Sequence, residues 1–107
     1  MTTSAGDVEV VDVPSENRFV VRHAGTEAEL VYHVNGQRLV LLHTEVPDEM
    51  SGQGIGADLV SAAVRRAQSD RLTLVPWCPF ARRWLREHPD AAAGVRIDWE
   101  TLPPEGQ

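Results

Sequence analysis

Alternating apolar and polar positions between residues 17 and 46 predict three strands. In residues 27–34 the apolar side chains share one face, as in a strand with one buried face. Asn35-Gly36 follows, and because both residues tolerate a positive φ the pair is a strong hairpin signal. We therefore expect residues 37–46 to pair antiparallel with residues 27–34. The apolar run Leu39–Leu42 within them predicts a strand that is covered on both sides.

Two helical segments follow these strands. Residues 58–67 place apolar side chains on one stripe, and residues 79–88 begin with Pro79, which suits the first position of a helix. Between them, residues 72–75 read as a short buried strand that lies parallel to the strand before the first helix. Residues 95–101 alternate and predict a last strand. The order β-β-β-α-β-α-(β) gives an α/β fold with a mixed, mostly antiparallel sheet and two helices.

The length of 107 residues predicts one domain, which we place at residues 16–101 between a mobile N-terminal tail, 1–15, and a C-terminal tail, 102–107. Residues 8–13 are either a short strand or part of the tail. A net charge of −6 argues against general nucleic-acid binding, and no apolar run is long enough to span a membrane. With a single cysteine and no signal peptide, we expect a cytoplasmic protein.

Three alternating glycines stand between the third strand and the first helix, in the run Ser51-Gly52-Gln53-Gly54-Ile55-Gly56-Ala57. Glycine lets an anion approach the backbone, and a helix start offers unpaired N–H groups, so the run predicts a phosphate site. A dinucleotide site requires an acidic residue at the end of the next strand, where this chain has Pro76-Trp77. A Walker-type loop is excluded because no Gly-Lys-Ser/Thr follows. A glycine-rich turn without a ligand is the remaining alternative.

The loop resembles the acyl-CoA loop of the GNAT N-acetyltransferase superfamily, with Ser51 where Arg or Gln is usual. Further likeness to the small, single-domain YjdJ-type branch covers residues 17–89 and lies in His43-Thr44-Glu45-Val46-Pro47, Pro76-x-Cys78-Pro79-Phe80, Trp84 and His88-Pro89. The resemblance implies a minimal GNAT fold that binds acetyl-CoA. It assigns the cosubstrate to Thr44, Glu45, Val46, Ser51, Gly52, Gln53, Gly54, Ile55, Gly56 and Ala57.

Cys78 and His43 are the candidate catalytic residues. Cys78 precedes Pro79 at a helix start, where the dipole stabilises a thiolate, although a lone cysteine can also be a small buried hydrophobe. Position 81 is alanine, so the second thiol of a dithiol redox site is missing. If their strands are parallel neighbours, His43 and Cys78 can face one cleft, and the resemblance implies that they line the acyl-CoA cleft. The other histidines lack metal-ligand spacing, and we expect no metal.

The expected function is transfer of an acetyl group from acetyl-CoA to a primary amine. His43 would act as general base, and Cys78 either as an acylated nucleophile or as a cleft residue that protonates the departing thiolate. The acidic composition suits a cationic amine such as a lysine side chain, a protein N-terminus or a polyamine. Two alternatives remain: a non-catalytic acyl-CoA sensor and a protein-interaction module with a vestigial loop. No motif specifies the acceptor or the oligomeric state.

Overall fold

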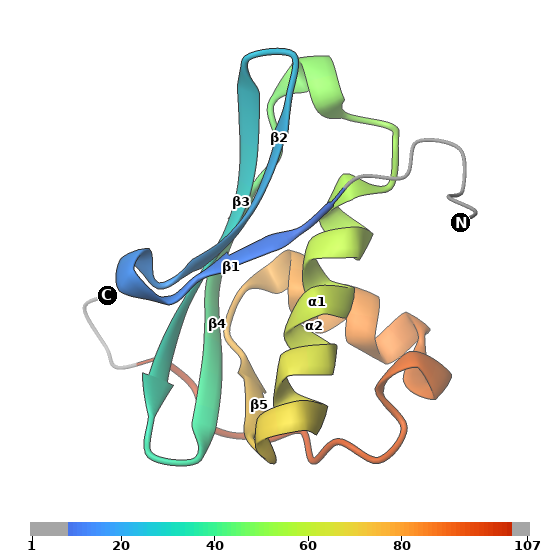
Figure 1. Cartoon of the computed structure of the whole chain (residues 1–107). Coiled ribbons are helices and arrows are strands. Elements are labelled where there is room, and N and C mark those ends of the chain that lie inside the picture. The colour runs from blue at the N-terminus through green and yellow to red at the C-terminus, as the bar shows by residue number, and fades with distance from the viewer. Residues whose placement is uncertain (1–8, 104–107) are drawn as a thin grey trace.

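The computed structural model describes residues 9–103, which form a five-stranded sheet and two helices (Figure 1). Neighbouring strands in the sheet follow one another along the chain, and α1 connects β4 to β5. This confirms the mixed sheet with two helices. The strands are β1 (Val11–Val13), β2 (Arg18–His23), β3 (Thr26–Asn35), β4 (Arg38–Glu45) and β5 (Thr73–Pro76), and the helices are α1 (Ile55–Asp70) and α2 (Pro79–Glu87). Short 3-10 turns are η1 (Pro14–Glu16), η2 (Asp48–Met50) and η3 (Pro89–Ala92).

The hairpin between β3 and β4 forms where the sequence predicts it. Asn35 pairs with Arg38, so the two loop residues are Gly36 and Gln37. Gly36 has a φ of +63°, and Gln37 is not among the described residues with a positive φ. The turn therefore lies one residue later than the Asn-Gly pair suggests, and one glycine supplies the positive φ that a tight hairpin needs at its first position.

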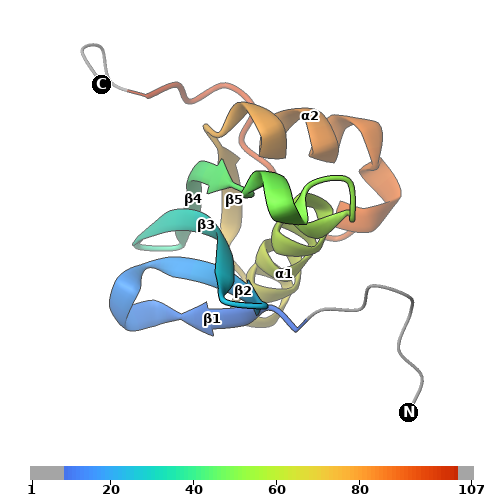
Figure 2. The ribbon, with the colours of Figure 1, turned by 90° about the horizontal axis from the view of Figure 1, so that it is seen from above.

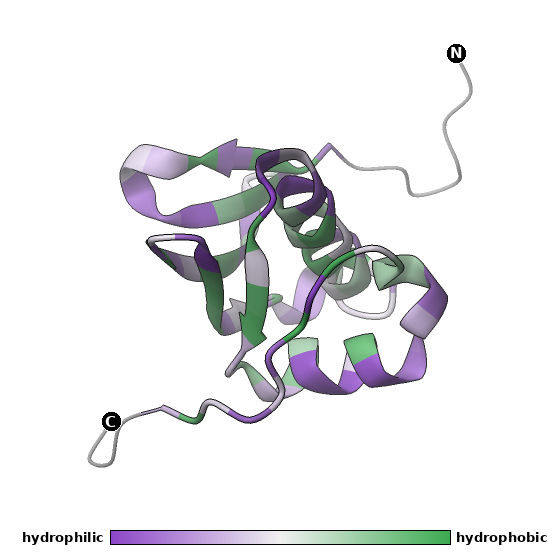
Figure 3. Cartoon of the chain, turned by 90° about the horizontal axis from the view of Figure 1, so that it is seen from below, coloured by the Kyte–Doolittle hydropathy of each residue, from purple (hydrophilic) through white to green (hydrophobic). Residues whose placement is uncertain are grey.

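Both helices pack on the same face of the sheet (Figure 2). Apolar residues gather in the strands and along α1, whereas α2 is largely hydrophilic (Figure 3). No polar or charged residue is buried within residues 9–103, and no helix there is long and apolar enough to cross a membrane. The largest fully buried side chains between sheet and helices include Phe19, Leu30, Leu39, Leu41, Leu59, Leu74 and Leu85.

Strand β4 is antiparallel to β3 and parallel to β5, as predicted. Tyr32 pairs with Leu41 but Val31 pairs with His43, so Leu42 is an extra residue in β4. Such a β-bulge bends the strand and changes which side chains face the core beyond it. The strand is covered on both sides only as far as the bulge, because Leu42 itself is 38% exposed.

Of the two alternatives for residues 8–13, the structure shows the strand: residues 11–13, within the expected tail 1–15, form β1 and pair with β2. Residues 1–8 lie outside the described part of the chain. A polar network fixes β1 to α1: Arg66 donates to Asp12 at 2.8 Å and to the hydroxyl of Tyr32 at 2.9 Å, and that hydroxyl donates to Asp12. Arg66 also donates to Asp70, and this contact raises the pKa of Arg66 further above its ordinary value. Arg66 of α1 thus contacts both β1 and β3.

The C-terminal segment pairs with β5 through one isolated bridge at Leu74 and does not form the full strand that was predicted for residues 95–101. Residues 96–98 make a parallel bridge, with Leu74 N–H donating to Arg96 C=O and Asp98 N–H donating to Leu74 C=O. Beyond them, residues 98–101 turn back over β4, because Asp98 accepts from Arg38 and from the backbone N–H groups of Glu100 and Thr101. We call residues 96–101 the C-terminal strap.

Candidate active site

A cavity of about 390 Å³ lies where the end of β4, the glycine loop and the first turns of both helices meet. Its size is within the range of roughly 300–1,000 Å³ that is usual for small-molecule sites. The lining combines apolar side chains with exposed loop backbone, which suits a ligand that carries both an apolar arm and an anionic group. The residues that line it are Thr44, Val46, Met50, Ser51, Gly52, Gly54, Ile55, Gly56, Ala57 and Phe80.

Two of the three alternating glycines are required by backbone conformation. Gly52 and Gly54 have φ values of +77° and +76°, in the left-handed region that residues with a Cβ rarely adopt. A Cβ at either position would meet no atom within 4 Å. Their role is therefore to let the chain turn sharply between η2 and α1 while leaving open space beside the backbone.

Helix α1 begins without a side-chain cap. Gly54 is its N-cap residue and makes no side-chain cap hydrogen bond. The first backbone bond of the helix runs from Asp58 N–H to Gly54 C=O at 3.0 Å. The N–H groups of residues 55–57 precede that bond, so the helix backbone supplies no acceptor for them. Because residues 55–57 line the cavity, a ligand in it can meet their backbone N–H donors and the positive end of the helix dipole.

Gly56, the third glycine, has a different role. It lies inside α1, and a Cβ at this position would be 2.7 Å from the Cζ atom of Phe80 and 2.9 Å from its Cε2 atom. The ring of Phe80, on the first turn of α2, therefore rests directly on the backbone of Gly56. The missing side chain makes room for an aromatic ring rather than for an anion.

The structure brings most of the predicted acetyl-CoA residues together. Thr44, Val46 and every loop residue from Ser51 to Ala57 except Gln53 line the cavity. The amide of Gln53 instead reaches back toward the carbonyl of Glu49, at 3.5 Å. The carboxylate of Glu45 lies beside His43. Neither of these two side chains is part of the lining.

Cys78 lies at the N-cap position of α2 and is 3% exposed. Its sulfur is 3.2 Å from the hydroxyl oxygen of Thr44, and either atom could donate the proton. The backbone N–H groups of Trp77 and Cys78 both donate to the carbonyl of Leu41, at 3.0 and 2.9 Å. The pairing of β4 with β5 ends at Leu41, where the two strands separate. The thiol therefore sits at the fork between them, next to the cavity residue Thr44.

His43 does not face the cleft that we expected it to share with Cys78. Thr44 pairs with the core residue Leu30 and contacts Cys78, and successive side chains of a strand point to opposite faces. The side chain of His43 therefore lies on the helix-free face of the sheet. There it is 60% exposed, and its Nε2 atom lies 3.4 Å from the Glu45 carboxylate.

The helix-free face near His43 is rich in carboxylates. Glu29 and Glu45 are direct cross-strand neighbours. Arg18 donates to Glu27 at 2.7 Å and to Glu29 at 2.9 Å. These contacts raise the pKa of Arg18 and lower that of Glu27. Among the described residues no group of three or more His, Cys, Asp or Glu side chains is arranged to hold a metal ion.

Two residues of the cavity were not predicted from the sequence. Met50 is buried at the end of η2 and closes the cavity beneath the loop. Phe80 is 39% exposed and lines the cavity, while Ala81 and Leu85 of the same helix are buried. The sequence signal for Phe80 is its place directly after the helix-initiating Pro79, at the first turn, where side chains project beyond the helix end.

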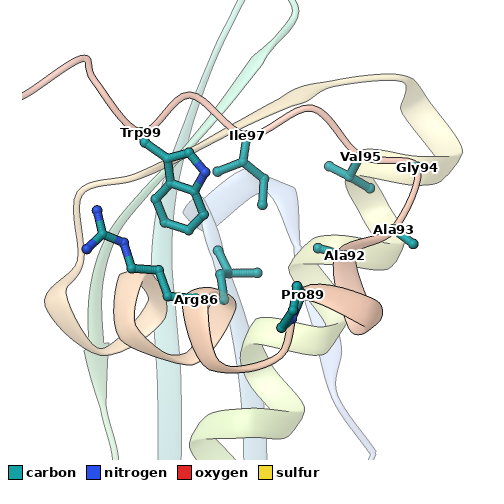
Figure 4. Close-up of a pocket in the computed structure, with 9 residues that line it drawn as sticks. Arg86, Pro89, Ala92, Ala93, Gly94, Val95, Ile97 and Trp99 are labelled. Atoms are coloured by element: carbon teal, nitrogen blue, oxygen red, sulfur yellow. The ribbon is translucent and has the colours of Figure 1, made fainter.

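A second hollow, of about 710 Å³, lies between α2, η3 and the segment 94–99 (Figure 4). Arg86 and Trp99 stand at one end, with the guanidinium carbon 5.1 Å from the centroid of the indole ring. The walls are otherwise small or aliphatic side chains, among them Ala92, Val95 and Ile97. None of the predicted site residues lines this hollow, so the smaller cavity is the candidate active site.

Comparisons with known proteins show the family of the chain. Residues 18–94 match the family model described as GCN5-related N-acetyl-transferase. Protein NATD1 of Mus musculus is 33% identical over 87 residues, which cover 78% of this chain and 79% of the relative. Protein NATD1 of Homo sapiens is 36% identical over 75 residues, 67% of this chain and 66% of the relative. The solution NMR structure of a GCN5-like protein from Staphylococcus aureus superposes with a TM-score of 0.65 at 27% identity, covering 86% of this chain and 91% of that one. The chain therefore belongs to the family of GCN5-related N-acetyltransferases.

Proposed function

We propose that the protein transfers an acetyl group from acetyl-CoA to a primary amine. The observation that carries the proposal is the uncapped first turn of α1, which opens on a cavity of about 390 Å³. The N–H groups of residues 55–57 would bind the pyrophosphate of the cosubstrate. Val46 and Met50 would contact its pantetheine arm, which would direct the thioester toward Thr44 and Cys78 at the fork between β4 and β5.

In the reaction, the amine nitrogen attacks the thioester carbon, the carbon–sulfur bond breaks, and the thiolate of CoA leaves. Backbone N–H groups near residues 44–46 would stabilise the negative charge that develops on the carbonyl oxygen. The amine must lose a proton to a base, and His43, on the other face of the sheet, is the candidate, directly or through water. The proton that the thiolate gains would come from Cys78 or from solvent.

The acceptor we propose is a cationic amine that approaches from the helix-free face. Glu29 and Glu45 are cross-strand neighbours beside His43, and the chain as a whole carries a net charge of −6. Arg18 already pairs with Glu29, so Glu45, whose side chain is 67% exposed beside His43, is the carboxylate that would attract an incoming cation. A lysine side chain, a protein N-terminus or a polyamine would meet this condition.

A second role for Cys78 is that of acyl carrier, with the acetyl group passing first to its sulfur and then to the amine. The composition allows a clean test, because all ten Lys and Arg residues of the chain are arginine. Tag-free protein can be mixed with acetyl-CoA and examined by intact mass spectrometry. One acetyl group that hydroxylamine removes, and that Cys78→Ala does not acquire, would establish the acyl-enzyme. Full activity of Cys78→Ala would exclude it.

One observation favours a different function, that of an acyl-CoA sensor: His43 lies on the opposite face from the thiol. The experiment that separates the two functions has two parts. Calorimetry with acetyl-CoA measures binding, and release of free CoA in the presence of a panel of amines measures transfer. Binding with turnover supports the transferase. Binding without turnover on any amine supports the sensor, and no binding contradicts both.

A further inference from the structure

Phe80 is a large apolar side chain that remains 39% exposed on a helix packed against the core. Helix α2 buries Ala81 and Leu85 against the sheet and α1, and both are at most 1% exposed. Phe80 instead lines the cavity, together with Thr44 and Val46 of the segment at the end of β4. Exposed aromatic surface in a cavity wall carries no benefit for folding, and it contributes free energy when a ligand covers it.

The position of the ring is fixed by Gly56. The Cζ and Cε2 atoms lie 2.7 and 2.9 Å from where a Cβ of Gly56 would be, so any side chain at position 56 would displace the ring. Gly56 belongs to the first turn of α1, whose N–H groups form the donor-lined part of the cavity. The ring therefore lies beside the first turn of α1, and it lines the same cavity as Val46 and Met50.

We infer that Phe80, seated on Gly56, is the residue that packs against the pantetheine arm of the CoA thioester and holds it against β4. The inference rests on the proposed function, since it assumes that the cavity binds a CoA ester. It assigns to one side chain the discrimination between a complete CoA ester and a nucleotide without the arm. An anion alone needs only the loop donors, whereas the uncharged arm needs an apolar surface on each side.

The first test compares binding of two ligands by calorimetry: acetyl-CoA and adenosine 3′-phosphate 5′-diphosphate, the nucleotide half of CoA. In Phe80→Ala the Kd for acetyl-CoA should rise about 10-fold, the loss usual for removing a buried aromatic contact, and that for the nucleotide should change less than about twofold. Phe80→Leu, which keeps an apolar side chain, should recover most of the affinity. Leu42→Ala is the matched control, because Leu42 is 38% exposed but lies on the β4 bulge, outside the cavity.

The second test uses Gly56→Ala, whose added methyl group would push the ring from its seat. This variant should also weaken acetyl-CoA binding about 10-fold. In the double variant with Phe80→Ala the two losses should not add, because both changes remove the same contact. Circular dichroism and thermal unfolding of every variant verify that the fold is retained.

Equal acetyl-CoA affinity in Phe80→Ala and the unchanged protein would overturn the inference, and so would an equal loss for both ligands. Those outcomes leave the proposed function intact, because the unchanged protein still binds acetyl-CoA. Failure of the unchanged protein to bind acetyl-CoA would overturn both.

Discussion

The hydroxyl oxygen of Thr44 lies 3.2 Å from the sulfur of Cys78 and connects β4 to the first turn of α2 across the fork where β4 and β5 separate. Thr44 lines the cavity, whereas Cys78 is almost fully buried behind it. The contact thus links the reacting end of the proposed site to the thiol. Within residues 9–103, the Cys78 thiol forms its hydrogen bond with this hydroxyl.

Replacing Thr44 by Val should lower kcat for acetyl transfer about 10-fold, because a lost hydrogen bond of roughly 1–1.5 kcal/mol corresponds to about that factor in rate. The KM for acetyl-CoA should change little, since the loop donors and Phe80 remain. Thr44→Ser keeps the hydroxyl and should stay close to the unchanged protein. Steady-state kinetics decide the matter, and full activity of the valine variant would show that the hydroxyl is incidental.

Replacing Gly54 by Ala should both destabilise the protein and weaken acetyl-CoA binding. Gly25 in the β2–β3 turn is a matched control, because its φ is +79° against +76° for Gly54 and both positions have open space for a Cβ. Each alanine should cost about 1–2 kcal/mol of unfolding free energy through backbone strain alone. Urea unfolding should therefore show similar losses, while calorimetry should show weaker acetyl-CoA binding only for Gly54→Ala. Equal affinity in the two variants would disprove a role for the loop.

Replacing His43 by Ala should reduce kcat by at least about 10²-fold if His43 is the general base, with the Kd for acetyl-CoA unchanged. His33 on β3 is exposed as well and lies outside the cavity lining, so His33→Ala serves as the control. Activity close to normal in His43→Ala would assign the proton transfer to another group or to water.

Acid should weaken the C-terminal strap through Asp98. The hydroxyl of Thr101, the guanidinium of Arg38 and two backbone N–H groups all donate to its carboxylate, so the pKa of Asp98 lies well below its ordinary value of 3.8. A lowered pKa in the folded protein means that the contribution to stability is complete above the unfolded-state pKa and is lost as the pH falls below it. The difference in Tm between the unchanged protein and Asp98→Asn should therefore shrink between about pH 5 and about pH 3.

The control for this prediction is Asp90→Asn, an exposed carboxylate on η3. Its Tm difference from the unchanged protein should stay small at every pH. The indole N–H of Trp77 donates to the carbonyl of Thr101 at 2.9 Å, so its NMR resonance should shift as the strap loosens. A Tm difference for Asp98→Asn that does not depend on pH would contradict the assignment.

The sequence was sufficient for the features that follow from periodicity and from glycine. Alternation in residues 27–34 and the Asn35-Gly36 signal predicted the β3–β4 hairpin, and the crossover through α1 predicted the parallel pairing of β4 with β5. The glycine run predicted a sharp turn before α1, and Gly52 and Gly54 have the positive φ values that such a turn needs, because φ is a local property of the backbone.

What the sequence did not predict depends on contacts between distant segments. Counting alternate residues from Leu39 and Leu41 would turn His43 toward the core, but the bulge at Leu42 adds one residue, so Thr44 faces inward instead. The sequence of β4 contains no pattern from which the bulge at Leu42 could be predicted. Likewise, the seat of Phe80 on Gly56 joins two helices that are separate in the sequence, and periodicity within either helix carries no information about it.

The strap also has a consequence for how copies of the protein can meet. Because residues 96–98 bond to Leu74, the backbone of β5 is partly covered instead of offering a free row of donors and acceptors. At the other border of the sheet, β1 is three residues long within the described chain and is followed at once by Pro14. Short, covered borders are poor templates for adding a strand from another molecule. Extension of the sheet from one molecule to the next is therefore disfavoured at both edges. Association of this protein with itself or with a partner should instead use side-chain surfaces.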